Sequence, residues 1–251
     1  MNSRLRALFG NILVLAALTT LSSLSGCGHS KQTRVTVPPP PPETSPEPKP
    51  AIASSPDLAE PSIPANAKSI ATEIGKASWY GPPYHNRTGS NGEVYNMHAM
   101  TAAHRTLPLG SIVRVTNLKT GHTALVRITD RGPFIPGRIL DLSLAAARKL
   151  DVYVPGTAEV KVQVMQAPVP IETGGKWAVQ IGAFPHEQEA SKFAENLTRR
   201  YRTAIKVQHF GSPVGDWWVR VRVLDDSRER AQKLVSETTT PDGAVFLVRL
   251  D

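Results

Sequence analysis

Alternation of apolar and polar residues divides the middle of the chain into short strands. Residues 157–165 alternate most clearly, with three valines on one face and Lys161 and Gln163 on the other. The same period of two predicts further strands at residues 76–81, 111–117 and 124–128. Ser143 can cap one short helix that runs through Leu150. Short strands separated by Gly and Pro turns, with a single helix, predict a small β-barrel over residues 75–166.

The pattern changes after residues 167–174, a short linker that contains two prolines. Apolar residues then recur at the spacing of an amphipathic helix over residues 187–201 and 227–237. Strand-like runs flank these helices at residues 177–183, 206–210, 217–224 and 244–250. Two successive βαβ units predict a small α+β domain over residues 175–251, with both helices on one side of an antiparallel sheet.

The N-terminal region lacks these patterns and carries targeting signals instead. Arg4 and Arg6 precede an apolar run over residues 8–21, which is too short to span a bilayer comfortably and is typical of a signal-peptide core. The run is followed by Leu-Ser-Gly-Cys27, and Cys27 is the single cysteine of the chain. This tetrapeptide resembles the bacterial lipobox, which implies a lipoprotein signal peptide over residues 1–26 and lipidation of Cys27. The alternative is an ordinary secretory signal with an incidental cysteine.

A proline-rich segment follows the cysteine. Half of the 22 prolines lie between Pro38 and Pro64, mixed with Ser, Glu, Lys and Ala. Because such a composition cannot bury enough apolar surface to fold, residues 27–74 are expected to form an extended, disordered linker. The alternative is a proline-rich ligand for a partner domain. By resemblance to Gram-negative lipoproteins, Gly28 in place of Asp after the cysteine implies an outer-membrane anchor that faces the periplasm.

Charge narrows the range of partners. The formal net charge is +8, which suits an anionic partner such as cell-wall polymer, membrane headgroups or nucleic acid. The sequence has no aromatic-rich strand motif, zinc-ligand spacing or long basic run, so we expect no nucleic acid as partner. His85, His98, His104 and Asp130 lack the tight spacing of metal ligands, so neither a metal nor another cofactor is expected.

Acidic residues are scarce in the predicted barrel, and this makes each of them a candidate for chemistry. Residues 75–166 contain five Asp and Glu against eleven Lys and Arg. Glu93 and Asp130 stand beside turn residues, and His104 lies between them in the sequence. A scarce carboxylate beside a turn in a basic domain points to a site for a sugar polymer or another extended ligand.

Each candidate residue also has a structural interpretation. Asp130 begins an Asp-Arg-Gly-Pro turn, and Glu93 follows Asn-Gly, where a hairpin would place an exposed acid. His104, taken alone, is more often a hydrogen-bonded structural histidine than a catalyst. Trp79 and Tyr80 suit either core packing or a platform on which sugar rings stack.

Six motifs of this region together resemble the rare lipoprotein A (RlpA) family. They are Gly-Lys-Ala-Ser-Trp-Tyr-Gly at 75–81, Asn-Gly-Glu at 91–93, Leu-Pro-Leu-Gly at 107–110, Val-Arg-Val-Thr-Asn at 113–117, Asp-Arg-Gly-Pro-Phe at 130–134 and Gly-Arg-Ile-Leu-Asp-Leu-Ser at 137–143. The resemblance implies a double-psi β-barrel and, in some members, a lytic transglycosylase that cuts the glycan strands of peptidoglycan. The family's glutamate, histidine and aspartate fall on Glu93, His104 and Asp130. Residues 86–90 depart from the family pattern in the loop that would shape a cleft beside Glu93.

The resemblance implies that Asp130 serves first as general acid and then as base, with Glu93 and His104 in support. The C6 hydroxyl of muramic acid would be the nucleophile and the product a 1,6-anhydro sugar. An unperturbed aspartic acid, with a pKa of about 3.9, is almost fully ionised at pH 7. A nearby ionised Glu93 or a partly apolar pocket would raise the pKa of Asp130, so we expect Glu93 and Asp130 to approach each other while Arg131 points away or binds substrate.

The C-terminal domain resembles the SPOR domain. The resemblance rests on Trp-Ala-Val-Gln-Ile-Gly-Ala-Phe at 177–184 and Arg-Val-Arg-Val at 220–223. It implies binding to glycan strands stripped of stem peptides, as occur at division septa. Strand alternation places Gln180 on the open face of the sheet, away from the helices, and puts Trp218 and Arg220 on one face of the third strand. These three residues are expected to bind glycan.

Together these features predict a lipid-anchored envelope protein, mostly β plus α+β, that is enriched at the septum. The barrel is expected to act as a lytic transglycosylase on peptidoglycan strands, preferably those without stem peptides, and the SPOR domain to deliver it. Two alternatives stay open: a non-catalytic peptidoglycan-binding or scaffolding lipoprotein, and a glycan hydrolase in which water replaces the C6 hydroxyl. The sequence identifies no protein partner.

Overall fold

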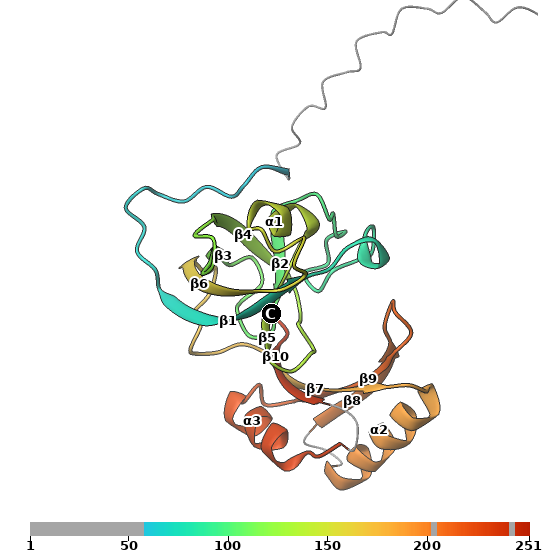
Figure 1. Cartoon of the computed structure of the whole chain (residues 1–251). Helices are drawn as coiled ribbons and strands as arrows, with labels where there is room; N and C mark the ends of the chain where they lie inside the picture. Colours follow the sequence, from blue (N-terminus) through green and yellow to red (C-terminus); the bar gives the residue numbers. More distant parts are fainter. Residues whose placement is uncertain (1–57, 202–204, 241–243) are drawn as a thin grey trace, which may run out of the picture. The chain divides into compact units, whose positions relative to one another are not determined.

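The computed structural model of the chain describes residues 58–201, 205–240 and 244–251 (Figure 1). The expected signal peptide, Cys27 and most of the expected linker lie outside these residues, so those expectations stay predictions. Across the described ranges, none of the helices is long and apolar enough to cross a bilayer.

In the described chain, six strands close into a barrel that occupies its N-terminal part (Figure 1). They are β1 (Ala71–Trp79), β2 (Thr101–His104), β3 (Ile112–Asn117), β4 (Thr123–Asp130), β5 (Arg138–Leu142) and β6 (Ala158–Gln166). Around the barrel they follow the order β1-β5-β2-β4-β3-β6. The pairs β1–β5 and β2–β4 are parallel and the other pairs are antiparallel. The predicted β-barrel is therefore confirmed.

The barrel core follows the alternation seen in the sequence. Val160, Val162 and Val164 of β6 are buried, and Val115 of β3, which pairs with Val162, is buried as well. They belong to one continuous apolar cluster that fills the barrel. Burial of this apolar surface is the main source of the barrel's stability, and it gives the site a rigid support.

Helix α1 (Leu144–Lys149) begins where Ser143 caps it, as predicted. The Ser143 hydroxyl accepts a hydrogen bond from Ala146 N–H at 3.1 Å and donates one to the Ala99 carbonyl at 2.7 Å. The same side chain thus satisfies an N–H group at the helix start and ties the helix to the segment before β2.

The barrel differs from the prediction at two strands and at its N-terminal end. Alternation does not reveal β2, because all four of its residues are buried, nor does it reveal β5. β1 begins at Ala71, where it pairs with Val164, and not at residue 76. Within the expected linker, Glu60 accepts a hydrogen bond from Leu125 N–H and pairs with Lys149. The last part of the expected linker therefore belongs to the barrel.

The C-terminal domain has the predicted α+β arrangement (Figure 1). Strands β7 (Trp177–Phe184), β8 (Ile205–Gly211), β9 (Trp217–Val223) and β10 (Ala244–Arg249) form an antiparallel sheet of order β10-β7-β9-β8. Helices α2 (Glu187–Tyr201) and α3 (Arg228–Glu237) cover one face of the sheet. On that face, Val179 and Ile181 of β7 share a buried cluster with Ala190 and Leu197 of α2 and Leu234 of α3.

Candidate active site

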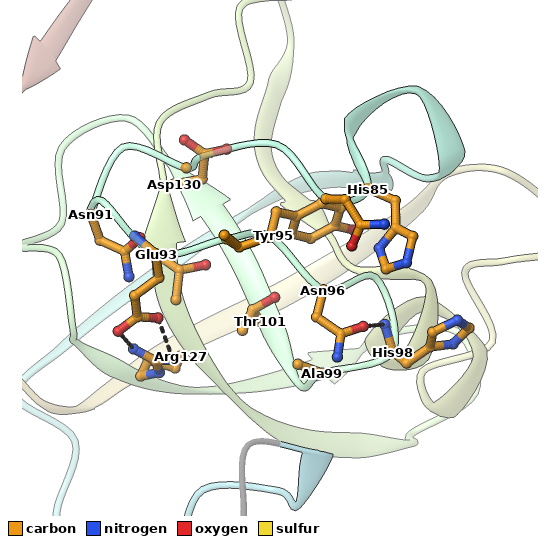
Figure 2. A pocket seen from close by; sticks show the side chains of 14 residues that line it. His85, Asn91, Glu93, Tyr95, Asn96, His98, Ala99, Thr101, Arg127 and Asp130 are labelled. Atoms are coloured by element: carbon orange, nitrogen blue, oxygen red, sulfur yellow. Dashed lines mark hydrogen bonds and ion pairs between the residues drawn. The ribbon is translucent and has the colours of Figure 1, made fainter. Parts of the chain in front are cut away.

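A polar cleft lies between strand β4 and the loop that connects the 3-10 helix η2 (Pro82–Tyr84) to β2. Its volume of about 750 Å³ is typical of a ligand-binding site. The loop contributes residues from His85 to Ala99, and β4 contributes Arg127, Thr129 and Asp130 (Figure 2). Glu93 and Asp130, the two acids singled out by the sequence, therefore line the same cleft.

The loop is shaped by a turn at the Asn-Gly-Glu motif. Gly92 has a φ of +85°, in the left-handed region that favours glycine. Asn91 Oδ1 accepts a hydrogen bond from Glu93 N–H at 3.0 Å, and Gly89 N–H donates to the Glu93 carbonyl at 2.8 Å. These contacts fix the backbone of Glu93 in the lining of the cleft.

A β-bulge near the end of β4 brings Asp130 into the cleft. Along the β2–β4 pair, Ala102 faces Ile128, but the next residue, Ala103, faces Asp130. Thr129 is therefore an extra residue on β4, and the alternation of side chains shifts there. Because of this shift, Arg127 and Asp130 both line the cleft although three positions separate them, while Ile128 remains in the core.

Asp130 has one carboxyl oxygen engaged and one available. Oδ1 accepts hydrogen bonds from Ser90 N–H at 3.0 Å, from the Ser90 hydroxyl at 2.5 Å and from Arg131 N–H at 2.8 Å. Oδ2 has no hydrogen-bond partner within the described part of the chain, which leaves this oxygen for a ligand. Ser90 belongs to the segment that departs from the family pattern, yet it supplies two of the three contacts.

Glu93 turns its carboxylate toward Arg127 and not toward Asp130 (Figure 2). Arg127 Nη1 donates to Oε1 at 2.9 Å, and Nη2 donates to Oε2 at 2.8 Å. The hydrogen bonds from Arg127 lower the pKa of Glu93. The expected approach of the two acids is therefore replaced by an ion pair. The sequence interpretation missed Arg127, although its place on the predicted strand, three residues before Asp130, was a usable signal.

His104 lies outside the cleft lining, buried in the barrel wall. Its Nδ1 accepts the backbone N–H groups of Thr106 at 3.2 Å and Leu107 at 3.1 Å, which places the ring proton on Nε2. Nε2 then donates to Glu73 Oε2 at 3.0 Å. Burial lowers the pKa of His104, and the hydrogen bond from His104 lowers the pKa of Glu73. The structure therefore does not bring His104 together with the two cleft acids.

Arg131 points away from the cleft, which is one of the two expected outcomes. Its Nη1 donates to the carbonyls of His104 at 3.0 Å and Leu107 at 2.7 Å, and the side chain is buried. Burial lowers the pKa of Arg131 to about 10, so the guanidinium stays charged at neutral pH. Its contacts brace the barrel wall, and they do not place the guanidinium where it would bind a ligand in the cleft.

The two aromatic candidates take different positions. Trp79 packs against the barrel core, with its ring 5.0 Å from that of Tyr153. Tyr80 stacks on Tyr95 with ring centroids 4.4 Å apart, and Tyr95 lines the cleft. Trp79 is therefore half-buried against the core, and Tyr80 packs behind Tyr95 without lining this cleft itself.

Further polar residues lie across the cleft from Arg127 (Figure 2). His85 and His98 have ring centroids 5.8 Å apart, and Asn96 Oδ1 accepts a hydrogen bond from the backbone N–H of His98 at 3.0 Å. Between the two sides lies Thr101, whose hydroxyl is buried. Such groups suit a hydroxyl-rich ligand. No cluster of three or more His, Cys, Asp or Glu in the described ranges could hold a metal.

The three candidates of the C-terminal domain share the sheet face opposite the helices. Gln180 Oε1 accepts a hydrogen bond from Arg220 Nε at 2.9 Å, and the Arg220 guanidinium lies 4.9 Å from the centre of the Phe210 ring. Trp218 belongs to a small apolar cluster with Phe246. Gln180 therefore lies on the sheet face opposite the helices, as expected, and glycan binding by these three residues stays a prediction.

Comparison with known families gives the class of the protein first. The lytic transglycolase family model matches residues 72–162, and the SPOR domain model matches residues 173–240. Together with the closed barrel and its carboxylate-lined cleft, these matches define a double-psi β-barrel protein with a C-terminal SPOR domain.

Curated relatives then give the family. A protein of Neisseria meningitidis serogroup A, named endolytic peptidoglycan transglycosylase RlpA, is 41% identical over 167 residues, which cover 59% of this chain and 70% of that protein. Proteins of the same name from Vibrio cholerae and Pseudomonas aeruginosa (strain UCBPP-PA14) are 45% identical over 133 residues and 41% identical over 150 residues. The matches span only 51% and 44% of those two proteins, and 50% and 60% of this chain. The chain belongs to the RlpA family.

Among solved structures, a papain inhibitor of Streptomyces aligns with a TM-score of 0.31 and 22% identity, over 38% of this chain and 96% of that one. This likeness is too low to carry an argument about the fold.

Proposed function

We propose that this chain is a lytic transglycosylase that cleaves the glycan strands of peptidoglycan and leaves 1,6-anhydro-muramic acid ends. The observation that carries the proposal is the shared cleft of Glu93 and Asp130, in a barrel of the RlpA family. The curated relatives described above are named endolytic peptidoglycan transglycosylases, which agrees with this assignment.

The available oxygen of Asp130 suits it for both proton transfers. Protonated at Oδ2, Asp130 donates its proton to the glycosidic oxygen as the bond to C1 breaks, and positive charge develops on the sugar ring. The C6 hydroxyl then attacks C1, and the ionised Asp130 accepts the proton of that hydroxyl. No water is consumed, and the carboxyl returns to its initial state. The Glu93 carboxylate stabilises the positive charge of the transition state.

His104 and Arg131 support this chemistry indirectly, by holding the backbone next to the site. His104 fixes the backbone of residues 104–107, and Arg131 donates to two carbonyls of the same segment. Both therefore hold the barrel wall next to the strand end that carries Asp130. Neither side chain reaches the cleft, so neither is assigned a direct part in bond cleavage.

The SPOR domain would deliver the barrel to glycan strands that lack stem peptides. As a member of this family with a SPOR domain, the chain is a cell-envelope protein associated with septal peptidoglycan. We further propose an outer-membrane anchor, facing the periplasm, through lipid on Cys27. Cells fed labelled palmitate are expected to label the wild-type chain and not Cys27→Ala, and equal labelling of both would contradict the anchor.

Product analysis tests the enzymatic proposal. The full chain, solubilised in detergent, is incubated with sacculi lacking stem peptides, and the products are identified by mass spectrometry. Wild type is expected to give anhydro-muramic ends and Asp130→Asn to give none. Asp151→Asn is the matched control, because it makes the same chemical change at an acid that pairs with His122 and does not line the cleft. Reducing ends would indicate a hydrolase, and binding without cleavage a scaffold.

A further inference from the structure

We infer that Arg127 is a positioning residue that holds Glu93 ionised and oriented, and thereby divides the chemistry between the two acids of the cleft. Glu93 is then the fixed negative charge that stabilises the positive sugar ring, and Asp130 is the group that moves the proton. This inference rests on the proposed function and deepens it, because it gives each acid a separate role and names the residue that separates them.

The geometry of the ion pair is the first support. Each of the two terminal nitrogens of Arg127 donates to its own oxygen of Glu93, at 2.9 and 2.8 Å (Figure 2). The two side chains are 34% and 56% exposed. A single contact at such exposure would add little stability. A two-point contact, however, fixes the plane and direction of the carboxylate, which is what a transition-state stabiliser requires.

The strand that carries Arg127 gives the second support. Arg127 and Asp130 both lie on β4, and the bulge at Thr129 turns both side chains into the cleft. The end of β4 therefore supplies both Arg127, which binds Glu93 through two hydrogen bonds, and Asp130, the second acid of the cleft. The spacing between Arg127 and Asp130 is set by the backbone of β4 and does not depend on the conformation of the loop.

The charges around Glu93 give the third support. Among the described residues, the titratable groups that line the cleft with Glu93 are Arg127 and Asp130 from β4 and His85, Tyr95 and His98 from the loop. Arg127 is the one of these that contacts the carboxylate, and its hydrogen bonds lower the pKa of Glu93. A permanent cation bound to both oxygens of Glu93 keeps this acid ionised.

Arg127 is not needed to hold the loop in place. Asn91 N–H donates to the Thr129 carbonyl at 3.2 Å, and the Ser90 hydroxyl bonds to Asp130 at 2.5 Å. Loop and strand are thus already joined at two points beside Arg127. Removal of the Arg127 charge should therefore change the ionisation and orientation of the Glu93 carboxyl and leave the backbone of the loop in place.

The test compares Arg127→Gln with Arg127→Lys, in the full chain. The first readout is the pH profile of kcat/KM on glycan strands without stem peptides. The second is the titration midpoint of the Glu93 carboxyl, followed by carbon NMR with labelled glutamate. Arg114→Gln, on β3 and outside the cleft lining, is the matched control for loss of an arginine from the barrel.

In Arg127→Gln, both the Glu93 midpoint and the acid limb of the profile are expected to move to higher pH. Each unit of this shift lowers the rate on the acid side about tenfold. Arg127→Lys, which keeps the charge and loses the fork, should restore most of the midpoint but not the full rate. In a Glu93→Gln background, Arg127→Gln should add little further loss, because both changes remove the same function.

Two results would overturn the inference. One is an unchanged Glu93 midpoint in Arg127→Gln. The other is a rate that falls equally at all pH values and adds fully to the effect of Glu93→Gln, because Arg127 would then act on the substrate directly. If wild type cuts no glycan, the proposed reaction fails, and the NMR titration still decides whether Arg127 sets the charge of Glu93.

Discussion

Replacement of His104 separates a structural from a chemical role for this histidine. The buried ring makes three hydrogen bonds: it accepts two backbone N–H groups and donates to Glu73. Each bond contributes about 1 kcal/mol, and an N–H left without an acceptor in the buried Leu107 costs more. His104→Ala should therefore lower the free energy of unfolding by at least about 3 kcal/mol. For a domain of the barrel's size this means a melting temperature lower by roughly 12 °C or more.

His104→Asn is the informative variant. The amide oxygen of Asn can accept the N–H groups of Thr106 and Leu107, so this variant keeps two of the three bonds and should lose only about 1 kcal/mol. Asn cannot transfer protons as imidazole does. If His104 is structural, His104→Asn stays folded and keeps most of its cleavage activity. The exposed His122, which pairs with Asp151, gives the control: His122→Ala should change the melting temperature by no more than about 2 °C.

The pH dependence of stability provides a second test. The pKa of His104 is lowered below its ordinary value of 6.5 by burial, and that of Glu73 is lowered below 4.5 by the hydrogen bond from His104. In both cases the folded state binds fewer protons than the unfolded state, so stability is present at neutral pH and is lost as the pH falls. The loss begins below about 6.5 with His104 and continues below about 4.5 with Glu73. The melting temperature of His104→Asn should therefore fall less than that of wild type when the pH is lowered from 7 to 5.

The assay is thermal unfolding, followed by circular dichroism at pH 7 and pH 5, beside cleavage of sacculi at the same pH values. One outcome refutes the structural interpretation. If His104→Asn melts within about 1 °C of wild type and shows the same pH dependence, yet releases no products, then His104 takes part in the chemistry itself.

Three further predictions concern the cleft, the core and the glycan-binding domain. Ser90→Ala removes the 2.5 Å hydroxyl contact to Asp130, the proposed general acid, and should lower the cleavage rate about tenfold without a change in melting temperature. Leu140→Ala leaves a cavity at a fully buried position of the barrel and should lower the free energy of unfolding, measured by chemical denaturation, by about 2–5 kcal/mol. Arg220→Gln breaks the 2.9 Å bond to Gln180 and should weaken pelleting with sacculi, whereas Arg230→Gln, an exposed change on α3, should not.

The sequence predicts those parts of the fold in which one face is buried and the other exposed. The β3 and β6 strands, the Ser143 cap and both helices of the C-terminal domain follow from periodicity and capping alone. β2 escapes because it is buried on both faces and therefore has no alternation. The start of β1 escapes because exposed residues fill its first half, which resembles the linker before it.

The candidate site is predicted only as far as its residue types. Glu93 and Asp130 are found in one cleft, but the partner of each depends on the fold. The bulge at Thr129 turns Arg127 and Asp130 to the same side, and alternation along a regular strand would have separated them. His104 pairs with Glu73, which the sequence assigns to the linker. Long-range pairings of this kind come from the order of strands in the barrel, which local patterns do not contain.

The partners of the two acids also bear on the choice between a transglycosylase and a hydrolase. An inverting hydrolase needs a second carboxylate that takes a proton from water. Both oxygens of Glu93 already accept hydrogen bonds from Arg127, and its lowered pKa makes it a weak base. Asp130, with Oδ1 held by three donors and Oδ2 available, can give and take a proton through a single oxygen. A nucleophile carried by the sugar itself needs no second base, so this arrangement favours attack by the C6 hydroxyl over attack by water.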